Sequence, residues 1–178
     1  APDYDMGMIL NIYTDAGSGE HNDVWPKEWA VDYIRVWKSN EGYQKVTKEY
    51  NIQNRQTGHY MYIDPDSTAV KYGPLTDENA AYAKWEKVKR GDYVLLKNCK
   101  TGEYLHIENL TGYVEHGEVP TTWWSAQWTE SEVDGYTRLI NRWQPDYSIH
   151  TEDYQWLIQY GNVPTTYWTS QWRFIQAN

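Results

Sequence analysis

The stretches HIENLTGYVEHGEVPTTWWSAQW (residues 106–128) and HTEDYQWLIQYGNVPTTYWTSQW (150–172) are copies of one sequence, 44 residues apart. A weaker copy precedes them, and all copies share a glycine, an acid nine residues before it, and a closing tryptophan. The glycines are Gly73, Gly117 and Gly161; the acids are Asp64, Glu108 and Glu152; the tryptophans are Trp85, Trp128 and Trp172. A repeat of this length is one structural unit copied three times, so it predicts the fold before any local pattern does.

Each copy predicts about four short strands separated by turn residues. The first strands read YNIQN (50–54), YVLLKN (93–98) and TRLINR (137–142), and we expect them to end at Asn54, Asn98 and Arg142. On the second strands, alternate residues point to opposite faces. One face is predicted to enter the core and carries Met61, Ile63, Leu105, Ile107, Ile149 and Thr151. The other face carries Tyr62 and Asp64, His106 and Glu108, and His150 and Glu152.

This arrangement predicts an all-β fold, a β-trefoil of three ~44-residue repeats. Threefold repetition favours a closed structure, which leaves no sheet edge exposed. The trefoil is expected to span residues 43–178, with repeats at about 43–90, 91–135 and 136–178. The closing tryptophans are predicted to anchor its core.

Residues 1–40 lie outside the repeat. The runs MGMILNIYT (6–14) and WAVDYIRVWK (29–38) predict an N-terminal two-stranded β segment, and the residues between them are typical of a loop. Two strands alone are marginal in water. We therefore expect this segment either to be part of a larger sheet or to pack on the domain that follows, to which a linker near residues 39–43 joins it.

The composition excludes some classes of partner. Lys and Arg total 16 against 25 for Asp and Glu, and the net charge is −9. This charge argues against nucleic acid, whose affinity depends on cations that neutralise phosphates, and disfavours a densely sulfated polymer. No apolar run approaches the roughly 20 residues of a membrane helix. No signal peptide is recognisable at the N-terminus of the sequence.

The aromatic usage points to a binding surface. The chain has 11 Trp and 17 Tyr but one Phe, and Trp and Tyr favour half-wet positions because each carries a polar group. Such surfaces suit a flat, hydroxylated ligand such as a sugar. No phosphate-binding glycine loop, zinc spacing or calcium loop is present, so no cofactor or metal is expected. The single cysteine, Cys99, is predicted to be a small packing residue.

The repeated acids could be read as the carboxylate pair of a glycosidase. However, equivalent positions of a threefold domain lie on different lobes, much farther apart than the about 5–10 Å that such catalysis needs. Each acid is therefore expected to act alone, accepting hydrogen bonds from ligand hydroxyls. The alternative is that these acids are merely solvated surface charges. No residue of the chain is predicted to be catalytic.

Aromatic residues precede two of the closing tryptophans, at Trp123–Trp124 and Tyr167–Trp168. An exposed indole offers a platform for the apolar face of a pyranose ring; the alternative is that these side chains cap the barrel. Each predicted unit is an acid with a tryptophan: Glu108 with Trp124, and Glu152 with Trp168. His106 and His150 would orient the acid or donate to a hydroxyl. The first copy has Ala81 at the aligned position, so a lesser site is expected near Asp64 and Tyr82.

Two parts of the sequence resemble known families. WPKEWAVDYIRVWK (25–38), with MGMILNIYT before it, resembles the closing strands of a family 16 glycoside hydrolase. The catalytic strand of that family is absent from this chain, so the resemblance implies no catalysis here. YLHIEN (104–109), YVEHG (113–117), WWSAQW (123–128) and YWTSQW (167–172) resemble carbohydrate-binding module family 92. That family implies a β-trefoil with up to three sites, each built on a Trp and an acid, and ligands such as β-1,3/β-1,6-glucan or carrageenan.

The sequence thus predicts a non-catalytic, extracellular module that binds polysaccharide and holds its own catalytic domain on the substrate. A sulfated ligand would require Lys or Arg beside each Trp, but only Lys71 lies near a site, and Glu115 and Gln159 replace it in the other copies. A β-glucan is therefore favoured over a red-algal sulfated galactan of the carrageenan or agar type. Two further alternatives are an interdomain packing module without a glycan ligand and an enzyme in its own right.

Overall fold

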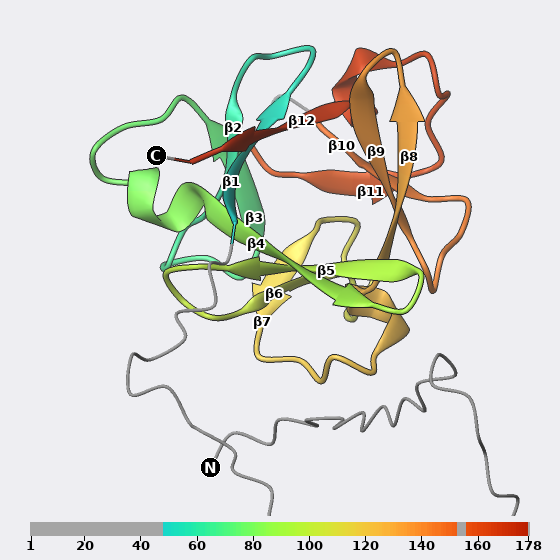
Figure 1. The fold of residues 1–178 in the computed structure, drawn as a ribbon, viewed down its shortest axis with the longest axis horizontal. Helices are drawn as coiled ribbons and strands as arrows, with labels where there is room; N and C mark the ends of the chain where they lie inside the picture. Colours follow the sequence, from blue (N-terminus) through green and yellow to red (C-terminus); the bar gives the residue numbers. More distant parts are fainter. Residues whose placement is uncertain (1–47, 153–155, 178) are drawn as a thin grey trace, which may run out of the picture. The chain divides into compact units, whose positions relative to one another are not determined.

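The computed structural model describes residues 48–152 and 156–177. These residues form the predicted β-trefoil (Figure 1), and they contain no α-helix. Within this part of the chain, no helix is long and apolar enough to cross a membrane. The predicted strands at residues 6–14 and 29–38 lie outside the described residues.

Each repeat contributes four strands and one short 3₁₀-helix, as predicted apart from the helix. The first repeat contains β1 (Glu49–Asn54), β2 (Tyr60–Ile63), β3 (Val70–Gly73), η1 (Ala80–Ala83) and β4 (Lys84–Arg90). The second contains β5 (Tyr93–Asn98), β6 (Tyr104–His106), β7 (Glu115–Gly117), η2 (Trp124–Ala126) and β8 (Trp128–Val133). The third contains β9 (Tyr136–Asn141), β10 (Ser148–His150), β11 (Gln159–Gly161), η3 (Trp168–Ser170) and β12 (Trp172–Gln176).

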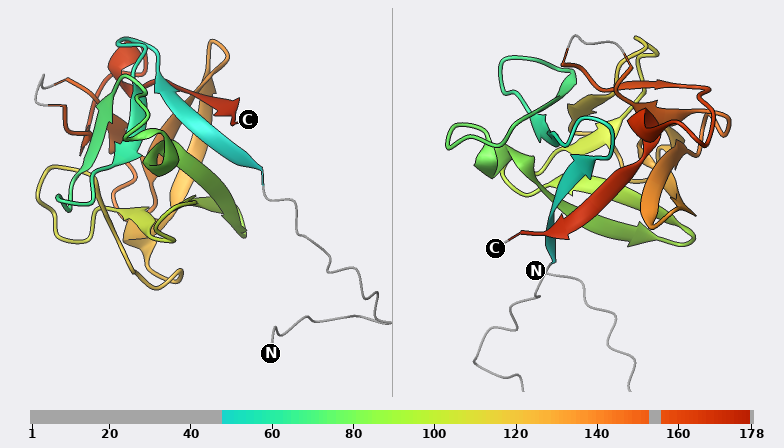
Figure 2. Two further views of the ribbon diagram at one scale, coloured as in Figure 1. Left: turned by 90° about the vertical axis from the view of Figure 1, so that its left-hand side faces the viewer. Right: turned by 90° about the horizontal axis from the view of Figure 1, so that it is seen from above.

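The first and last strands of the repeats close into a barrel. Antiparallel pairing runs from β1 to β4, β5, β8, β9 and β12, and β12 pairs again with β1. The remaining strands pair as the hairpins β2–β3, β6–β7 and β10–β11. The repeats follow one another around a common centre (Figure 2). Closure satisfies every barrel edge internally, which is why three short, individually unstable units form one stable domain.

A ring of backbone hydrogen bonds lies at the centre of the hairpins. The Val70 N–H donates to the Val114 carbonyl at 2.8 Å, Val114 to Ile158 at 2.7 Å, and Ile158 back to Val70 at 2.9 Å. The three residues occupy equivalent positions and are all buried. The ring therefore joins all three repeats by one interaction used three times, and satisfies buried amides that no ladder reaches.

The closing tryptophans lie in the core, as predicted. Trp85, Trp128 and Trp172 are fully buried. Their indole N–H groups donate to the carbonyls of Met61, Leu105 and Ile149 at 3.1, 3.3 and 3.3 Å. Each indole thus fills the core and also ties the last strand of its repeat to the second strand. The residues of the predicted inward face are likewise buried in all three copies. The second strands are shorter than predicted, since β6 and β10 end at His106 and His150, before the acids.

A buried asparagine ends the first strand of each repeat: Asn54, Asn98 and Asn141. In the third repeat, the Asn141 side-chain oxygen accepts the backbone N–H groups of Trp143 and Gln144 at 2.9 and 3.2 Å. The side-chain oxygens of Asn54 and Asn98 accept the same two backbone N–H groups, in turns that are one residue shorter. The expectation that the first strand of the third repeat ends at Arg142 is therefore wrong by one residue, since β9 ends at Asn141. Arg142 follows the asparagine, at the position of Arg55 and Cys99 in the other repeats.

Candidate functional site

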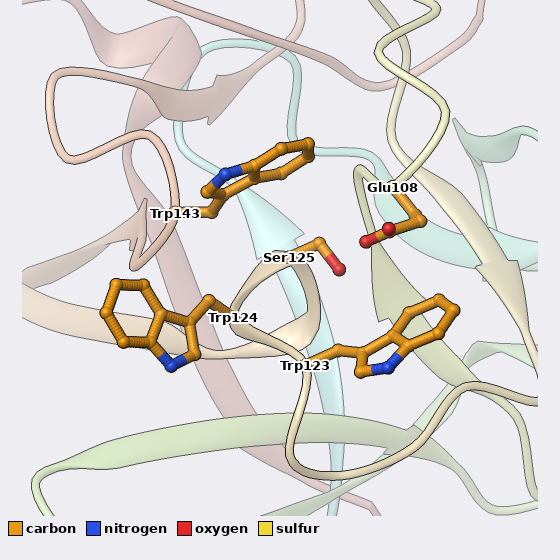
Figure 3. A pocket seen from close by; sticks show the side chains of 5 residues that line it. All are labelled: Glu108, Trp123, Trp124, Ser125 and Trp143. Carbon is orange, nitrogen blue, oxygen red and sulfur yellow. The ribbon is translucent and has the colours of Figure 1, made fainter.

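Two surface hollows contain the predicted acid and tryptophan pairs. The second-repeat site is an open cleft of about 290 Å³ lined by Glu108, Trp123, Trp124, Ser125 and Trp143 (Figure 3). The third-repeat site is a broader hollow of about 500 Å³ lined by Gln56, Glu152, Thr166, Tyr167, Trp168 and Thr169. The fold therefore brings each loop aromatic pair beside the acid that precedes it by 15 or 16 residues in the sequence.

The loop aromatics face solvent and do not cap the barrel. Trp124 is 54% exposed and Trp168 is 50% exposed. Each begins a one-turn 3₁₀-helix, whose next residues, such as Ser125 and Ala126, turn into the core. The neighbouring Trp123 and Tyr167 are also exposed. The short helix thus explains how adjacent residues point in opposite directions, one into the protein and one into the site.

An arginine that the sequence reading missed packs on one face of each site tryptophan. The Arg142 guanidinium carbon lies 4.2 Å from the ring centre of Trp124 and 4.3 Å from that of Tyr93. Arg142 also donates to the side-chain oxygen of buried Gln127 at 2.6 Å. The result is a Tyr–Arg–Trp stack. Since arginine covers one face of the indole, only the other face remains for a ligand.

The third-repeat site has the same stack. The Arg55 guanidinium carbon lies 4.3 Å from the Trp168 ring centre and 4.5 Å from that of Tyr136. Arg55 donates to Gln171 at 2.5 Å and forms an ion pair with Asp134 at 3.3 Å. In both sites the arginine comes from the repeat that follows the tryptophan around the barrel. Each site therefore spans a repeat boundary, which comparison within one repeat does not reveal.

The first repeat lacks every layer of this stack. Glu49, Cys99 and Ala81 stand where the other sites have tyrosine, arginine and tryptophan. Cys99 is exposed, so the prediction of a packing cysteine is wrong. Tyr82, near which a lesser site is predicted, is aligned with Ser125 and packs partly buried against the core.

The acid of the first repeat is also engaged within the protein. Asp64 forms an ion pair with Lys71, and the hydrogen bond from Lys71 lowers the pKa of that carboxyl. Glu115 and Gln159 occupy the position of Lys71 in the other repeats. Asp64 is therefore less available than Glu108 and Glu152 to accept hydrogen bonds from a ligand.

The repeated histidines are buried behind the sites. His106 and His150 are only 5% and 8% exposed. A side chain at Gly117 or Gly161 would meet their ring nitrogens at 3.2 and 3.3 Å, which explains the repeated glycine. His106 Nδ1 accepts the backbone N–H of Glu108 at 3.3 Å. His106 thus orients the segment that carries the acid, as expected, but it is too buried to donate to a ligand hydroxyl.

This burial makes stability depend on pH. Desolvation lowers the pKa of His106 below its ordinary value of 6.5. The unfolded chain then binds a proton that the folded chain excludes, so stability is complete above about pH 6.5 and falls as the pH drops below it. We expect His106→Gln to flatten the fall in unfolding free energy between about pH 7.5 and 5, measured by urea titration. An unchanged slope would contradict this assignment.

Hydroxyl groups complete both sites. Ser125 is buried, and its hydroxyl has no hydrogen-bond partner within the described residues. Figure 3 shows this hydroxyl between Glu108 and the aromatic side chains. In the third-repeat site the aligned Thr169 donates to Glu152 at 3.1 Å. Each site therefore presents exposed aromatic side chains and one carboxylate, with a hydroxyl group beside the acid; the Ser125 hydroxyl is too buried to reach solvent. Among the described residues, no group of three or more His, Cys, Asp or Glu could hold a metal ion.

No protein-family model matches the chain, and no curated protein matches it. Among solved structures, the chain is similar to the GlcNAcα1-4Gal-releasing endo-β-galactosidase from Clostridium perfringens, with 62% identity and a TM-score of 0.73. That match covers 93% of this chain and 41% of the endo-β-galactosidase. It is wider than the trefoil, so it includes residues before 48. The chain thus spans less than half of that protein.

Two further structures are similar in fold alone. The designed threefold-symmetric protein ThreeFoil is 18% identical, with a TM-score of 0.63 over 72% of this chain and 99% of its own. A Polyporus squamosus lectin bound to a Neu5Acα2-6Galβ1-4GlcNAc epitope is 13% identical, with a TM-score of 0.61 over 73% of this chain and 49% of its own. These neighbours are β-trefoils, in agreement with the observed topology.

Proposed function

We propose that the trefoil is a glycan-binding module without catalytic activity of its own. The observation that carries this proposal is the repeated site: an exposed indole, fixed from behind by arginine, beside a carboxylate. A pyranose ring has an apolar C–H face that stacks on an indole, and hydroxyl groups that donate to a carboxylate. The indole and carboxylate of each site lie close enough to serve one sugar, as both line one hollow.

The positions of the acids favour binding over catalysis. Glu108 and Glu152 line different hollows, and glycoside hydrolysis needs two carboxyl groups that flank one bond. The described part of the chain places a single predicted acid in each site. A binding role requires only one, because a carboxylate accepts hydrogen bonds from hydroxyls without a partner acid.

The similar endo-β-galactosidase suggests the context of the module. We infer that this chain belongs to a larger, extracellular glycosidase of that kind, with residues 1–40 derived from its catalytic domain. The module would hold that domain on a glycan containing GlcNAcα1-4Gal. Its assignment to carbohydrate-binding module family 92, and of the N-terminal segment to glycoside hydrolase family 16, remain predictions from the sequence. β-1,3/β-1,6-glucan remains a predicted alternative ligand.

One reason for disfavouring a sulfated galactan is wrong. The sequence suggested that no cation lies beside the second and third sites, but Arg142 and Arg55 contact Trp124 and Trp168 directly. These guanidinium groups could attract an anionic sugar. Both are already stacked and bound by glutamine oxygens, which favours a neutral ligand, with a sulfated galactan as the second candidate.

Affinity electrophoresis tests the proposal. We expect retardation in gels that contain a GlcNAcα1-4Gal-bearing mucin, and compare gels with laminarin, carrageenan or no glycan. Trp124→Ala with Trp168→Ala should abolish retardation. Trp156→Ala is the matched control, because Trp156 is 52% exposed and does not line either hollow.

The outcomes separate the candidates. Binding to carrageenan that collapses between about 50 and 500 mM salt would indicate the sulfated ligand. Retardation by laminarin alone would support the glucan. If no glycan retards the parent protein, the glycan-binding proposal is overturned in favour of an interdomain packing role. If a glycan retards the double variant as much as the parent, the assignment of binding to Trp124 and Trp168 is overturned.

The arginine layer gives a separate prediction. Arg142→Gln should lower sugar affinity at the second-repeat site by about threefold to tenfold, because the indole loses the cation that holds its orientation. Titration calorimetry in the Trp168→Ala background measures this site alone. Lys89→Gln, an exposed change of equal charge, is the control. An unchanged affinity in Arg142→Gln would show that the stack does not position the platform.

A further inference from the structure

The two sites differ at one matched backbone position. The N–H groups of Trp143 and Gln56 donate to the preceding asparagine side chains at 2.9 and 3.1 Å. Lys100 occupies the same position in the first repeat, at 3.0 Å from Asn98 Oδ1. The hydrogen bond to the asparagine side chain is therefore common to all three turns. The turn that contains Trp143 is one residue longer than the others, since the Asn141 N–H donates to the Tyr147 carbonyl, six residues on, whereas Asn54 and Asn98 donate to His59 and Glu103, five residues on. The sites thus differ at this position in side chain and in turn length.

Trp143 changes the shape of the second-repeat site. It is 39% exposed and forms one wall of the cleft, with Trp123 on the opposite side of Ser125 (Figure 3). Trp124 forms a third aromatic side. The third-repeat site has Gln56 in place of Trp143 and is lined by two aromatic residues, Tyr167 and Trp168. The two hollows have volumes of about 290 and 500 Å³.

We propose that Trp143 extends the second-repeat site to two consecutive sugar units, whereas the third-repeat site holds one. A pyranose ring has two faces, so a single sugar stacks on two aromatic side chains at most. Three exposed indoles line the second-repeat site, and the third indole is left for the neighbouring unit of the chain. This inference rests on the proposed glycan-binding function and names Trp143 as its specificity-determining residue.

Single-site variants provide the test. Trp168→Ala disables the third-repeat site and keeps the second-repeat site intact. Trp124→Ala does the reverse. Each is titrated calorimetrically with two pairs of sugars: galactose against GlcNAcα1-4Gal, and glucose against laminaribiose. The protein is expected to bind one of these two pairs. At the second-repeat site we expect its disaccharide to bind about tenfold more tightly than its monosaccharide, because one more sugar ring stacks on an indole. At the third-repeat site the difference should stay below about twofold.

A reciprocal exchange then isolates the residue. Trp143→Gln in the Trp168→Ala background should remove the preference for the disaccharide. Gln56→Trp in the Trp124→Ala background should create it. Both positions are exposed or partly exposed, and their backbone hydrogen bonds do not depend on the side chain. Neither change is expected to unfold the protein, and circular dichroism verifies this.

The outcomes distinguish this inference from the function on which it rests. If both sites bind sugar with the same ratio of disaccharide to monosaccharide affinity, the inference is overturned and the glycan-binding function stands. The same holds if Trp143→Gln keeps the preference for the disaccharide. If neither site binds any of the four sugars, the inference falls, and the glycan-binding function is then decided by the electrophoresis.

Discussion

Replacing either Trp124 or Trp168 by alanine should weaken binding to a polysaccharide surface by about 100-fold, while the remaining site keeps its affinity for a short oligosaccharide. The two sites lie at different repeat boundaries, and each is an open surface hollow. Once one site is occupied, the second contact is intramolecular, and such linkage raises the overall affinity by about 10²–10⁴-fold. The loss of one site therefore costs far more on a polymer than its own contacts suggest.

Surface plasmon resonance on immobilised polysaccharide measures the first quantity, and calorimetry with an oligosaccharide measures the second. The double variant should show no retention on the polymer, and Trp156→Ala should match the parent protein. If each single variant binds the polymer as tightly as the parent, the sites do not engage one chain together, and the multivalent mechanism is wrong.

Trp128→Ala should lower the free energy of unfolding by about 3–5 kcal/mol, the usual cost of deleting a buried aromatic side chain. Trp128 is fully buried, and its N–H group donates to the Leu105 carbonyl at 3.3 Å. The substitution leaves both a cavity and an unpaired carbonyl. Since a domain of this kind is stable by about 5–15 kcal/mol, the loss is a large share of the total.

Trp124→Ala, four residues earlier, is the matched control and should change stability by no more than about 1 kcal/mol. Trp124 is 54% exposed, so the substitution removes little buried surface. Urea unfolding followed by circular dichroism compares the two variants. Similar losses in both would contradict the division into core and site tryptophans. Trp128→Phe, which restores much of the volume but not the hydrogen bond, should fall between them.

These predictions differ in how directly they follow from the sequence. The core role of Trp128 was predicted from its repetition, and the structure confirms it. The pairing of Glu108 with Trp124 was predicted from alternation along a strand and the position of a loop, and one cleft contains both. The partners of Trp124 on its other face were not predicted. A one-residue error at the end of β9 placed Arg142 inside a strand and concealed its equivalence to Arg55.

The sequence by itself determined the threefold repeat, the closing tryptophans and the acid that faces away from the core. Each of these depends on spacing within one repeat: the tryptophans lie at the start of the closing strands, and the acids follow the ends of β2, β6 and β10. Only the tertiary structure decided which arginine stacks on each site tryptophan. It also decided that Trp143 lines the second-repeat site, whereas the equivalent Gln56 lines the third-repeat site. Those residues belong to the following repeat, and barrel closure brings them to the site. The first repeat keeps the fold without the stack, because the fold needs only the buried tryptophan and the asparagine turn, whereas the site needs side chains from two repeats.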